Sequence, residues 1–206
     1  MATRRGVGRP AEGNSEATRQ AILASAKRAF ALQGYATTTL KGVAEDAGLT
    51  QGTVYFYYRS KADLFLAVDA VVSDGLLSRL RDAASSASTL AEKWSAVLDA
   101  CVALAEEDPV LVQYSANVRT EARRHPEIAE VGHDRRFGDF LGEMVKAGVA
   151  TGEVARRDAA KTRLVLATAL NGLTQASADL DFQHYRQVVE AYKQAFSTPF
   201  PAVTAG

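Results

Sequence analysis

Apolar residues recur three and four positions apart along most of the chain, which is the spacing of one face of an α-helix. No stretch shows the period-two alternation that indicates a half-buried strand. The first predicted helix runs from Ser15 to about Gln33, and Gly34 ends it. Its apolar stripe consists of Ile22, Ala26, Ala29 and Phe30.

Two short helices are predicted next, on either side of a tight turn. Thr37–Thr39 offer N-cap hydroxyls for the first of them, and Gly48 stands where a helix end must turn left-handed. Thr50 can then cap a second helix from about Gln51 to Tyr57. Two short helices joined by a glycine-containing turn are typical of a helix-turn-helix, whose second helix enters the major groove of DNA.

Capping residues and prolines divide the rest of the chain into about six further helices. Thr89 and Glu92 match a capping box, Pro109 fits the first position of a helix, and His125-Pro126 breaks the pattern again. Asp158 and Asp181 can cap the last two helices. The predicted spans are 62–84, 89–107, 109–124, 127–147, 158–180 and 181–196, with a loop at 148–154.

These elements predict an all-α fold of about nine helices. The expected organisation is a flexible basic arm at 1–14, a three-helix helix-turn-helix domain at 15–61, a larger helical domain at 62–196 and a loose tail at 197–206. A hydrophobic content of 47% is enough for a buried core.

Charge is unevenly distributed, although the formal net charge of the 206 residues is zero. Through Lys61 there are nine Lys or Arg and four Asp or Glu, a balance of +5, whereas the remainder has 15 basic and 20 acidic residues. A basic N-terminal third on an acidic body indicates a DNA-binding domain attached to something else.

The predicted second helix of the helix-turn-helix carries side chains suited to base edges. The Gln51 amide can pair with adenine, the Thr53 methyl group can contact thymine, and Gly52 lets the backbone approach closely. Tyr55, Tyr57 and Lys61 can reach phosphates, whereas Val54 and Tyr58 are expected in the core. The full predicted set of DNA contacts is Thr38, Thr39, Lys41, Thr50, Gln51, Gly52, Thr53, Tyr55, Phe56, Tyr57 and Lys61, with Arg4, Arg5 and Arg9 of the arm.

The arm admits two interpretations, which the sequence leaves open. Its arginines resemble those that lie in narrow minor grooves, and the same composition fits a disordered, solubilising tail.

A pattern of about thirty residues resembles the DNA-binding domain of the tetracycline-repressor (TetR) family. It consists of Gly34-Tyr35, Thr38, Val43-Ala44, Ala47-Gly48-Leu49-Thr50, Gly52-Thr53-Val54-Tyr55, Tyr58, Ser60-Lys61 and Leu64. The chain departs from the family in carrying Tyr57 where His is usual. The resemblance implies a dimeric transcriptional regulator, expected to be a repressor, that binds a palindromic double-stranded operator and is released by a small hydrophobic effector.

The resemblance also implies two sites in the larger domain. A homodimer would form through the last two helices, and we expect Leu166, Leu170, Leu173, Val188, Val189 and Tyr192 at that interface. An effector cavity would lie among the preceding helices. Its candidate lining is Trp94, Tyr114, Asn117, Phe137, Phe140, Asn171 and Gln175, each of which could instead be an ordinary core or surface residue.

Other chemistries find little support in the sequence. The three histidines are scattered, one cysteine cannot form a zinc set, and no phosphate-binding glycine loop is present, so we expect no metal, no cofactor and no enzyme activity. No apolar run is long enough to span a membrane and no secretory leader is seen, which favours a cytoplasmic protein. The alternative is a helical small-molecule binder or enzyme with a vestigial DNA-binding domain.

Overall fold

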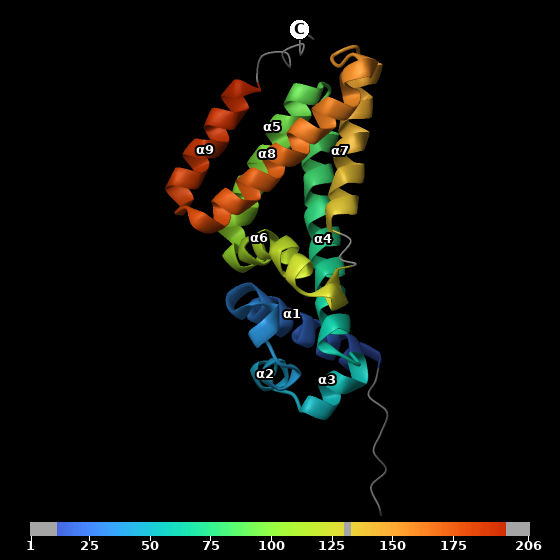
Figure 1. Ribbon diagram of the computed structural model, residues 1–206, viewed down its shortest axis with the longest axis vertical. Coiled ribbons are helices and arrows are strands. Elements are labelled where there is room, and N and C mark those ends of the chain that lie inside the picture. The colour runs from blue at the N-terminus through green and yellow to red at the C-terminus, as the bar shows by residue number, and fades with distance from the viewer. Residues whose placement is uncertain (1–11, 130–132, 197–206) are drawn as a thin grey trace, which may run out of the picture.

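The computed structural model describes residues 12–129 and 133–196, and within these ranges all regular structure is helical. The helices are α1 (Glu12–Thr37), α2 (Leu40–Asp46), α3 (Gln51–Tyr57), α4 (Lys61–Ser85), α5 (Leu90–Glu107), α6 (Pro109–Arg124), α7 (His133–Ala150), α8 (Ala159–Asp179) and α9 (Phe182–Ala195). Short 3₁₀ turns occupy Pro126–Ile128 and Arg156–Asp158. Figure 1 shows α1–α3 at one end of an elongated molecule and α5 and α7–α9 at the other, with α4 running between them.

The chain reversals in the N-terminal part depend on two glycines with left-handed backbones. Gly34 has φ 78° and interrupts α1, which confirms the predicted break at this residue. Gly48 has φ 67° in the turn between α2 and α3. The Thr39 and Thr50 hydroxyls cap α2 and α3 by accepting N–H groups of Gly42 and Thr53. The helix-turn-helix therefore begins and ends where its local signals predicted.

Two hydrophobic cores lie one above the other along α4. The N-terminal core contains α1–α3 side chains together with Leu64, Phe65 and Val68 of α4, Tyr114 and Val118 of α6, and Ile128. The second core lies among α4, α5 and α7–α9. Because α4 and α6 both contribute to the N-terminal core, the packing does not divide at residue 61, where the sequence placed the domain boundary.

The connection between α6 and α7 differs from the prediction. A helix from Glu127 is wrong, because Pro126–Ile128 form a 3₁₀ turn and α7 begins at His133. Ile128 is completely buried in the N-terminal core, which keeps this turn against α4 and α6 and off the line of α7. Helix α7 also continues to Ala150, three residues into the predicted loop.

The two predicted aspartate caps behave differently. Asp181 accepts the N–H groups of Gln183 and His184 at the start of α9, as predicted. Asp158 occupies the cap position of α8, but its side chain caps nothing, and its carbonyl instead accepts the Thr162 hydroxyl. The backbone of Asp158 is already helical, with φ −99° and ψ −5°, because a 3₁₀ turn precedes α8.

Asp108 joins α6 to α1 and has a perturbed acidity. Its carboxylate accepts the Leu111 N–H at 2.9 Å and the Lys27 ammonium at 2.5 Å. Burial alone would raise the pKa of Asp108, but these hydrogen bonds outweigh it and hold the pKa below its usual value. The folded chain therefore favours the ionised carboxylate.

Acid should accordingly weaken the fold through Asp108. A carboxyl group with a lowered folded pKa contributes stability above the unfolded aspartate pKa, about 3.9, and loses it as the pH falls through the folded pKa. We expect the free energy of unfolding, measured by urea titration, to fall below pH of about 4, and to fall less in Asp108→Asn. The exposed Asp82→Asn variant should retain the wild-type acid loss. Equal acid losses in all three proteins would contradict this assignment.

The described part of the chain has neither a membrane-spanning helix nor a metal-binding cluster. Its helices include none with the length and apolar character needed to cross a membrane. Among the same residues, no group of three or more His, Cys, Asp and Glu side chains is arranged to hold a metal ion.

Candidate nucleic-acid interface and effector pocket

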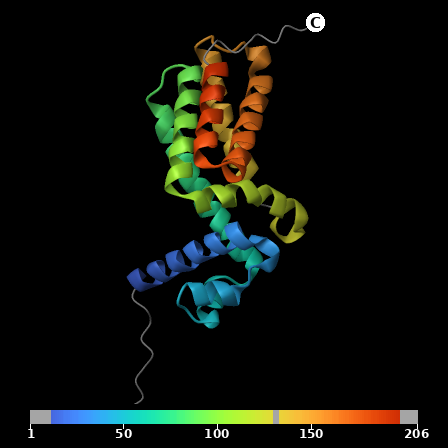
Figure 2. The ribbon, with the colours of Figure 1, turned by 90° about the vertical axis from the view of Figure 1, so that its left-hand side faces the viewer.

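Helix α3 presents one face to solvent and anchors the other in the N-terminal core. Val54 is completely buried and Tyr58 is 8% exposed, as expected from the sequence, whereas Phe56 is 83% exposed and Tyr55 is 50% exposed. Gln51 and Gly52 are exposed at the N-terminal end of the helix. Figures 1 and 2 place α2 and α3 at the end of the molecule farthest from the body. This face is free to enter a groove of DNA.

Thr50 and Thr53 form a small hydrogen-bonded unit at the start of α3. Thr50 Oγ1 accepts the Thr53 N–H at 3.1 Å and lies 2.8 Å from Thr53 Oγ1. Because the cap uses the Thr50 hydroxyl, the Thr53 side chain can be changed without removing the cap.

Three other predicted DNA contacts already have partners within the protein. The Tyr57 hydroxyl donates to the Ser15 carbonyl at 3.0 Å, which ties α3 to α1. The Lys61 ammonium donates to the carbonyls of Tyr35 and Ala36 at 2.7 and 3.0 Å, and it also lies 4.4 Å from the centroid of the Tyr35 ring. The exposed Lys41 lies 3.7 Å from Glu45. Their phosphate contacts stay predictions.

The prediction that Thr38 contacts DNA is corrected by its position. Thr38 is 2% exposed, and its hydroxyl donates to the Gly34 carbonyl at 2.7 Å. This side chain stabilises the break that ends α1 and is not available to a groove. Thr39 is the N-cap of α2, and Arg4, Arg5 and Arg9 lie outside the described residues.

Helix α6 is clamped to the end of α1 by polar contacts. The Glu121 carboxylate accepts the Tyr35 N–H at 3.0 Å, and the Asn117 amide donates to the Ala31 carbonyl at 3.3 Å. The His125 ring lies 4.8 Å from the Tyr35 ring and 3.6 Å from the Glu121 carboxylate. A Cβ at Gly34 would stand 3.4 Å from Glu121 Oε1, an ordinary contact, so it is the φ of 78° that requires glycine at this position.

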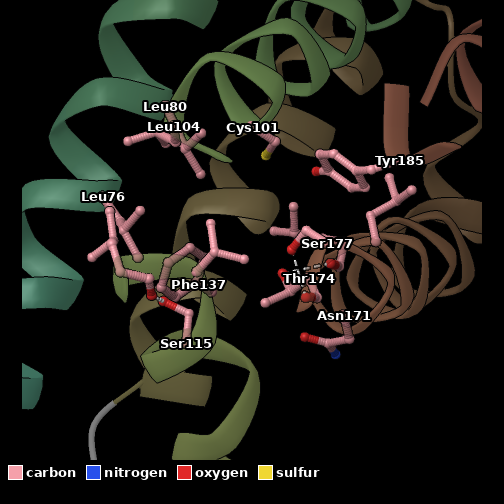
Figure 3. Close-up of a pocket in the computed structure, with 14 residues that line it drawn as sticks. Leu76, Leu80, Cys101, Leu104, Ser115, Phe137, Asn171, Thr174, Ser177 and Tyr185 are labelled. Atoms are coloured by element: carbon pink, nitrogen blue, oxygen red, sulfur yellow. Dashed lines mark hydrogen bonds between the residues drawn. The ribbon is translucent and has the colours of Figure 1, made fainter. Parts of the chain in front are cut away.

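A mostly apolar pocket lies in the body among α4–α9, with a cavity volume of about 60 Å³ (Figure 3). Leucines of α4, α5 and α6 form one side, and α8 and α9 contribute several polar side chains to the other. The lining consists of Leu76, Leu80, Cys101, Leu104, Leu111, Val112, Ser115, Phe137, Leu170, Asn171, Leu173, Thr174, Ser177 and Tyr185. None of these residues is charged. Burial raises the pKa of the Cys101 thiol to about 12, so it is a neutral lining group.

The structure brings only Phe137 and Asn171 of the predicted ligand residues to this pocket. Asn117 faces α1, Gln175 is exposed and bonds Asp179, and Phe140 is buried in the second core beside Arg81. The sequence could not show which of these residues line the pocket, because the helices that meet around a cavity are decided by the tertiary arrangement.

Trp94 and Tyr114 were also predicted to bind the ligand, and both are buried away from the pocket. Trp94 is packed in the second core and Tyr114 in the N-terminal core, and the Trp94 Nε1 and Tyr114 hydroxyl have no hydrogen-bond partner among the described residues. Burial, followed by the charge of Asp69, raises the pKa of Tyr114 well above its usual value.

The predicted dimer residues on α8 lie on the wrong face of the helix. This face packs into the second core of the same chain, so the side chains of Leu166, Leu170 and Leu173 are at most 6% exposed. Val189 of α9, also predicted at the interface, is fully buried in the same core. Val188 and Tyr192 are partly buried against that core. The exposed apolar residues of α8 are Leu164 and Val165, at 67% and 44%, and Leu180 follows at 41%.

Comparisons with known proteins agree with this geometry. Residues 22–68 match the family described as bacterial regulatory proteins, tetR family. The HTH-type transcriptional regulator AcrR of Shigella flexneri is 39% identical over 59 residues, which cover 29% of this chain and 27% of AcrR. The HTH-type transcriptional regulator YfiR of Bacillus subtilis, an uncharacterized protein, is 31% identical over 140 residues, which cover 64% of this chain and 65% of YfiR. The chain thus spans less than two thirds of the length of these relatives.

The fold similarity extends over the body. A crystal structure of the transcriptional regulator FadR from Bacillus subtilis, in complex with stearoyl-CoA, superposes with a TM-score of 0.73. It covers 88% of this chain and 99% of FadR at 17% identity, so the likeness concerns the fold. Residues 22–68 thus form a DNA-binding domain of the tetR family of bacterial regulatory proteins, and the described chain as a whole shares the fold of the regulator FadR.

Proposed function

We propose that this protein is a dimeric, effector-responsive transcriptional repressor that binds an inverted-repeat operator. Helix α3 enters the major groove, the second core contains the effector pocket, and a second copy of the chain binds at α8 and α9. A bound dimer would exclude transcription from the operator it covers.

The observation that carries the proposal is the contrast between the two faces of α3. The helix is held by its Thr50 cap and by the buried Val54 and Tyr58, while Gln51 and Phe56 project into solvent at the tip of the molecule. Phe56 and the neighbouring Tyr55, which is 50% exposed, give this solvent face two large aromatic side chains. Such side chains can contact a thymine methyl group or a sugar edge.

The dimer surface is supported by the exposed side of α8. Leu164, Val165, Thr168 and Gly172 are exposed at helical spacing, which forms a short stripe of apolar and small residues. Such a stripe permits close approach of another helix. Two copies related by a two-fold axis would present two α3 helices to successive half-sites.

Coupling between effector and operator is supported by helices that belong to both parts. Helix α6 contributes Leu111, Val112 and Ser115 to the pocket and, further along, Asn117 and Glu121 to the clamp on α1. Helix α4 likewise lines the pocket and starts in the N-terminal core. An effector that favours one arrangement of α4 and α6 would therefore change the placement of α3 and so the operator affinity.

Stearoyl-CoA, which is bound in the Bacillus subtilis FadR structure, does not fit the pocket of this chain as an effector. A coenzyme A thioester has several phosphates, which require cationic partners when they leave water. The lining of this pocket contains no Lys or Arg.

The proposed function is tested by selecting genomic fragments that the purified, ligand-free protein binds at about 0.15 M salt, where non-specific phosphate binding is weakened. We expect one inverted repeat to be enriched, with two protein chains bound to each copy. Absence of any enriched sequence would count against a sequence-specific regulator and favour the helical binder or enzyme.

Variants of Thr53 then test whether α3 reads bases. We expect Thr53→Ala to reduce the preference for the operator over random DNA by roughly 1–3 kcal/mol, since a lost base contact is of that size. Thr53→Val retains the methyl group and Thr53→Ser the hydroxyl, so fluorescence anisotropy on all three variants shows which group is read. Equal losses on operator and random DNA would contradict base reading by Thr53.

A further inference from the structure

The effector pocket has an internal polarity that restricts the chemistry of its ligand. Its α4, α5 and α6 side is hydrocarbon apart from Ser115 and Cys101, whereas α8 and α9 place Asn171, Thr174 and Tyr185 together on the opposite side (Figure 3). A ligand in this space would have to turn its polar atoms toward α8 and α9 and its hydrocarbon toward α4.

Hydroxyl groups of the pocket differ in what they can still donate. Ser115 Oγ donates to the Leu111 carbonyl at 2.8 Å, Thr174 Oγ1 to the Leu170 carbonyl at 2.9 Å, and Ser177 Oγ to the Thr174 carbonyl at 2.7 Å. Each hydroxyl has one hydrogen, so these three can offer a ligand only their lone pairs.

Tyr185 is the donor that remains. Its side chain is 2% exposed, its hydroxyl points into the pocket in Figure 3, and it has no hydrogen-bond partner among the described residues. Burial raises the pKa of Tyr185, so the phenol keeps its proton and can only be satisfied by an acceptor. The half-buried Asn171 amide, also without a hydrogen-bond partner among those residues, adds N–H donors on the same side.

The uncharged lining of the pocket also disfavours a charged ligand. A carboxylate or phosphate brought into the pocket would lose its water and meet no cation, and an ammonium would meet no anion. An uncharged oxygen acceptor avoids both costs.

The volume limits the size of the ligand. The cavity of about 60 Å³ is smaller than the roughly 150 Å³ cavity that holds benzene. Even a one-ring molecule must therefore displace leucine side chains such as Leu76, Leu104 and Leu111. Since Leu76 and Leu111 also pack against the N-terminal core, their displacement would be felt at the α4 and α6 ends that hold α1.

We infer that the effector of this protein is a compact, uncharged and mainly hydrocarbon molecule with a carbonyl or ether oxygen, oriented by a hydrogen bond from Tyr185. This inference rests on the proposed function for its regulatory meaning, but the binding chemistry can be tested in the absence of DNA.

The test is isothermal titration calorimetry of the full-length, DNA-free protein with three compounds of similar shape: acetophenone, ethylbenzene and benzoate. We expect acetophenone to bind roughly threefold to tenfold more tightly than ethylbenzene, because one net hydrogen bond is of that order. Benzoate should bind at least about 100-fold more weakly than acetophenone, since its charge has no partner in the pocket.

The role of Tyr185 is tested with Tyr185→Phe, which retains the ring and removes the hydroxyl. The preference for acetophenone over ethylbenzene should disappear in this variant and persist in Tyr192→Phe, a matched change on α9 outside the pocket. An unchanged preference in Tyr185→Phe would overturn the orientation by Tyr185.

Two wild-type outcomes would overturn the ligand class without any variant: benzoate binding as tightly as acetophenone, or no binding of any of the three compounds. Neither outcome bears on operator selection, which uses the ligand-free protein. Failure of the ligand inference and failure of the proposed function are therefore distinguishable.

Discussion

Replacing Phe65 with Ala is expected to lower the free energy of unfolding by about 3–5 kcal/mol, the usual cost of truncating a fully buried phenylalanine. Phe65 is 1% exposed, and its ring centroid lies 4.9 Å from that of Phe30, 5.3 Å from Tyr35 and 5.7 Å from Tyr114. These four rings come from α1, α4 and α6. The substitution would leave a cavity where the DNA-binding helices meet the body.

Urea denaturation followed by circular dichroism measures this loss, and Phe56→Ala provides the matched control. Phe56 is 83% exposed, so its truncation should change the free energy of unfolding by no more than about 0.5 kcal/mol. The order of the two variants should reverse in the DNA-binding assay, where Phe56→Ala weakens binding although the fold is intact. A Phe65→Ala protein as stable as wild type would contradict the ring cluster as the link between the two parts.

Features set by neighbouring residues were predictable from the sequence. Gly34 interrupts its helix where the break was predicted, Gly48 has the left-handed backbone expected of it, and Thr50 caps a helix that ends at Tyr57 as predicted. The Thr89–Glu92 capping box forms with both of its hydrogen bonds. Such signals act over three or four residues, so the sequence alone contains the physics that decides them.

Features set by contacts distant in sequence were not predictable in the same way. Thr38 looked like a surface threonine near the DNA-binding helix, but its hydroxyl is used by the Gly34 carbonyl. Leu166, Leu170 and Leu173 form a helical apolar stripe, which cannot say whether the chain itself or a second copy covers it; here it is the chain itself. The exposed Leu164 and Val165, the better candidates for the dimer, belong to a shorter and weaker stripe.

The pocket was likewise not predictable from the sequence, because its lining comes from residues distant in the chain. The sequence does not single out Tyr185, because nothing nearby indicates that its hydroxyl meets α5 and α8. A signal was present in Ser115, Thr174 and Ser177, which are hydroxyl residues on otherwise apolar helical faces. Helical hydroxyls that bond to a carbonyl four residues earlier are common in ordinary cores, however, so this signal does not distinguish a pocket from a core.

The clamp between α6 and α1 unites the fold with the proposed regulation. Glu121 has a side chain 15% exposed, and its carboxylate is the acceptor of the Tyr35 N–H just beyond the Gly34 break. The pocket-lining part of α6 lies a few turns away on the same rigid helix. A movement of α6 at Leu111 or Ser115 would therefore be transmitted to the position where α1 ends and the chain turns toward α2.

Glu121→Ala is expected to lower the free energy of unfolding by about 1.5–3 kcal/mol, since it leaves the Tyr35 N–H without its charged acceptor. Amide hydrogen exchange at Tyr35 should become at least about tenfold faster, because the opening of this segment loses the same contribution. Glu121→Gln keeps an acceptor oxygen and should retain most of the protection. Glu106→Ala, an exposed change at the end of α5, should leave both quantities unchanged.

The exchange pattern separates a local clamp from a general loss of stability. If Glu121 acts at the end of α1, exchange should accelerate at Tyr35 and its neighbours more than at Val97 or Leu98 in the second core, where these residues are completely buried. Uniform acceleration in both cores would mean that Glu121 contributes only to global stability, and α6 would then lose its place as the connection between pocket and operator. A local change accompanied by a weaker effect of acetophenone on operator affinity would establish that connection, since coupling requires that both sites bias the same element.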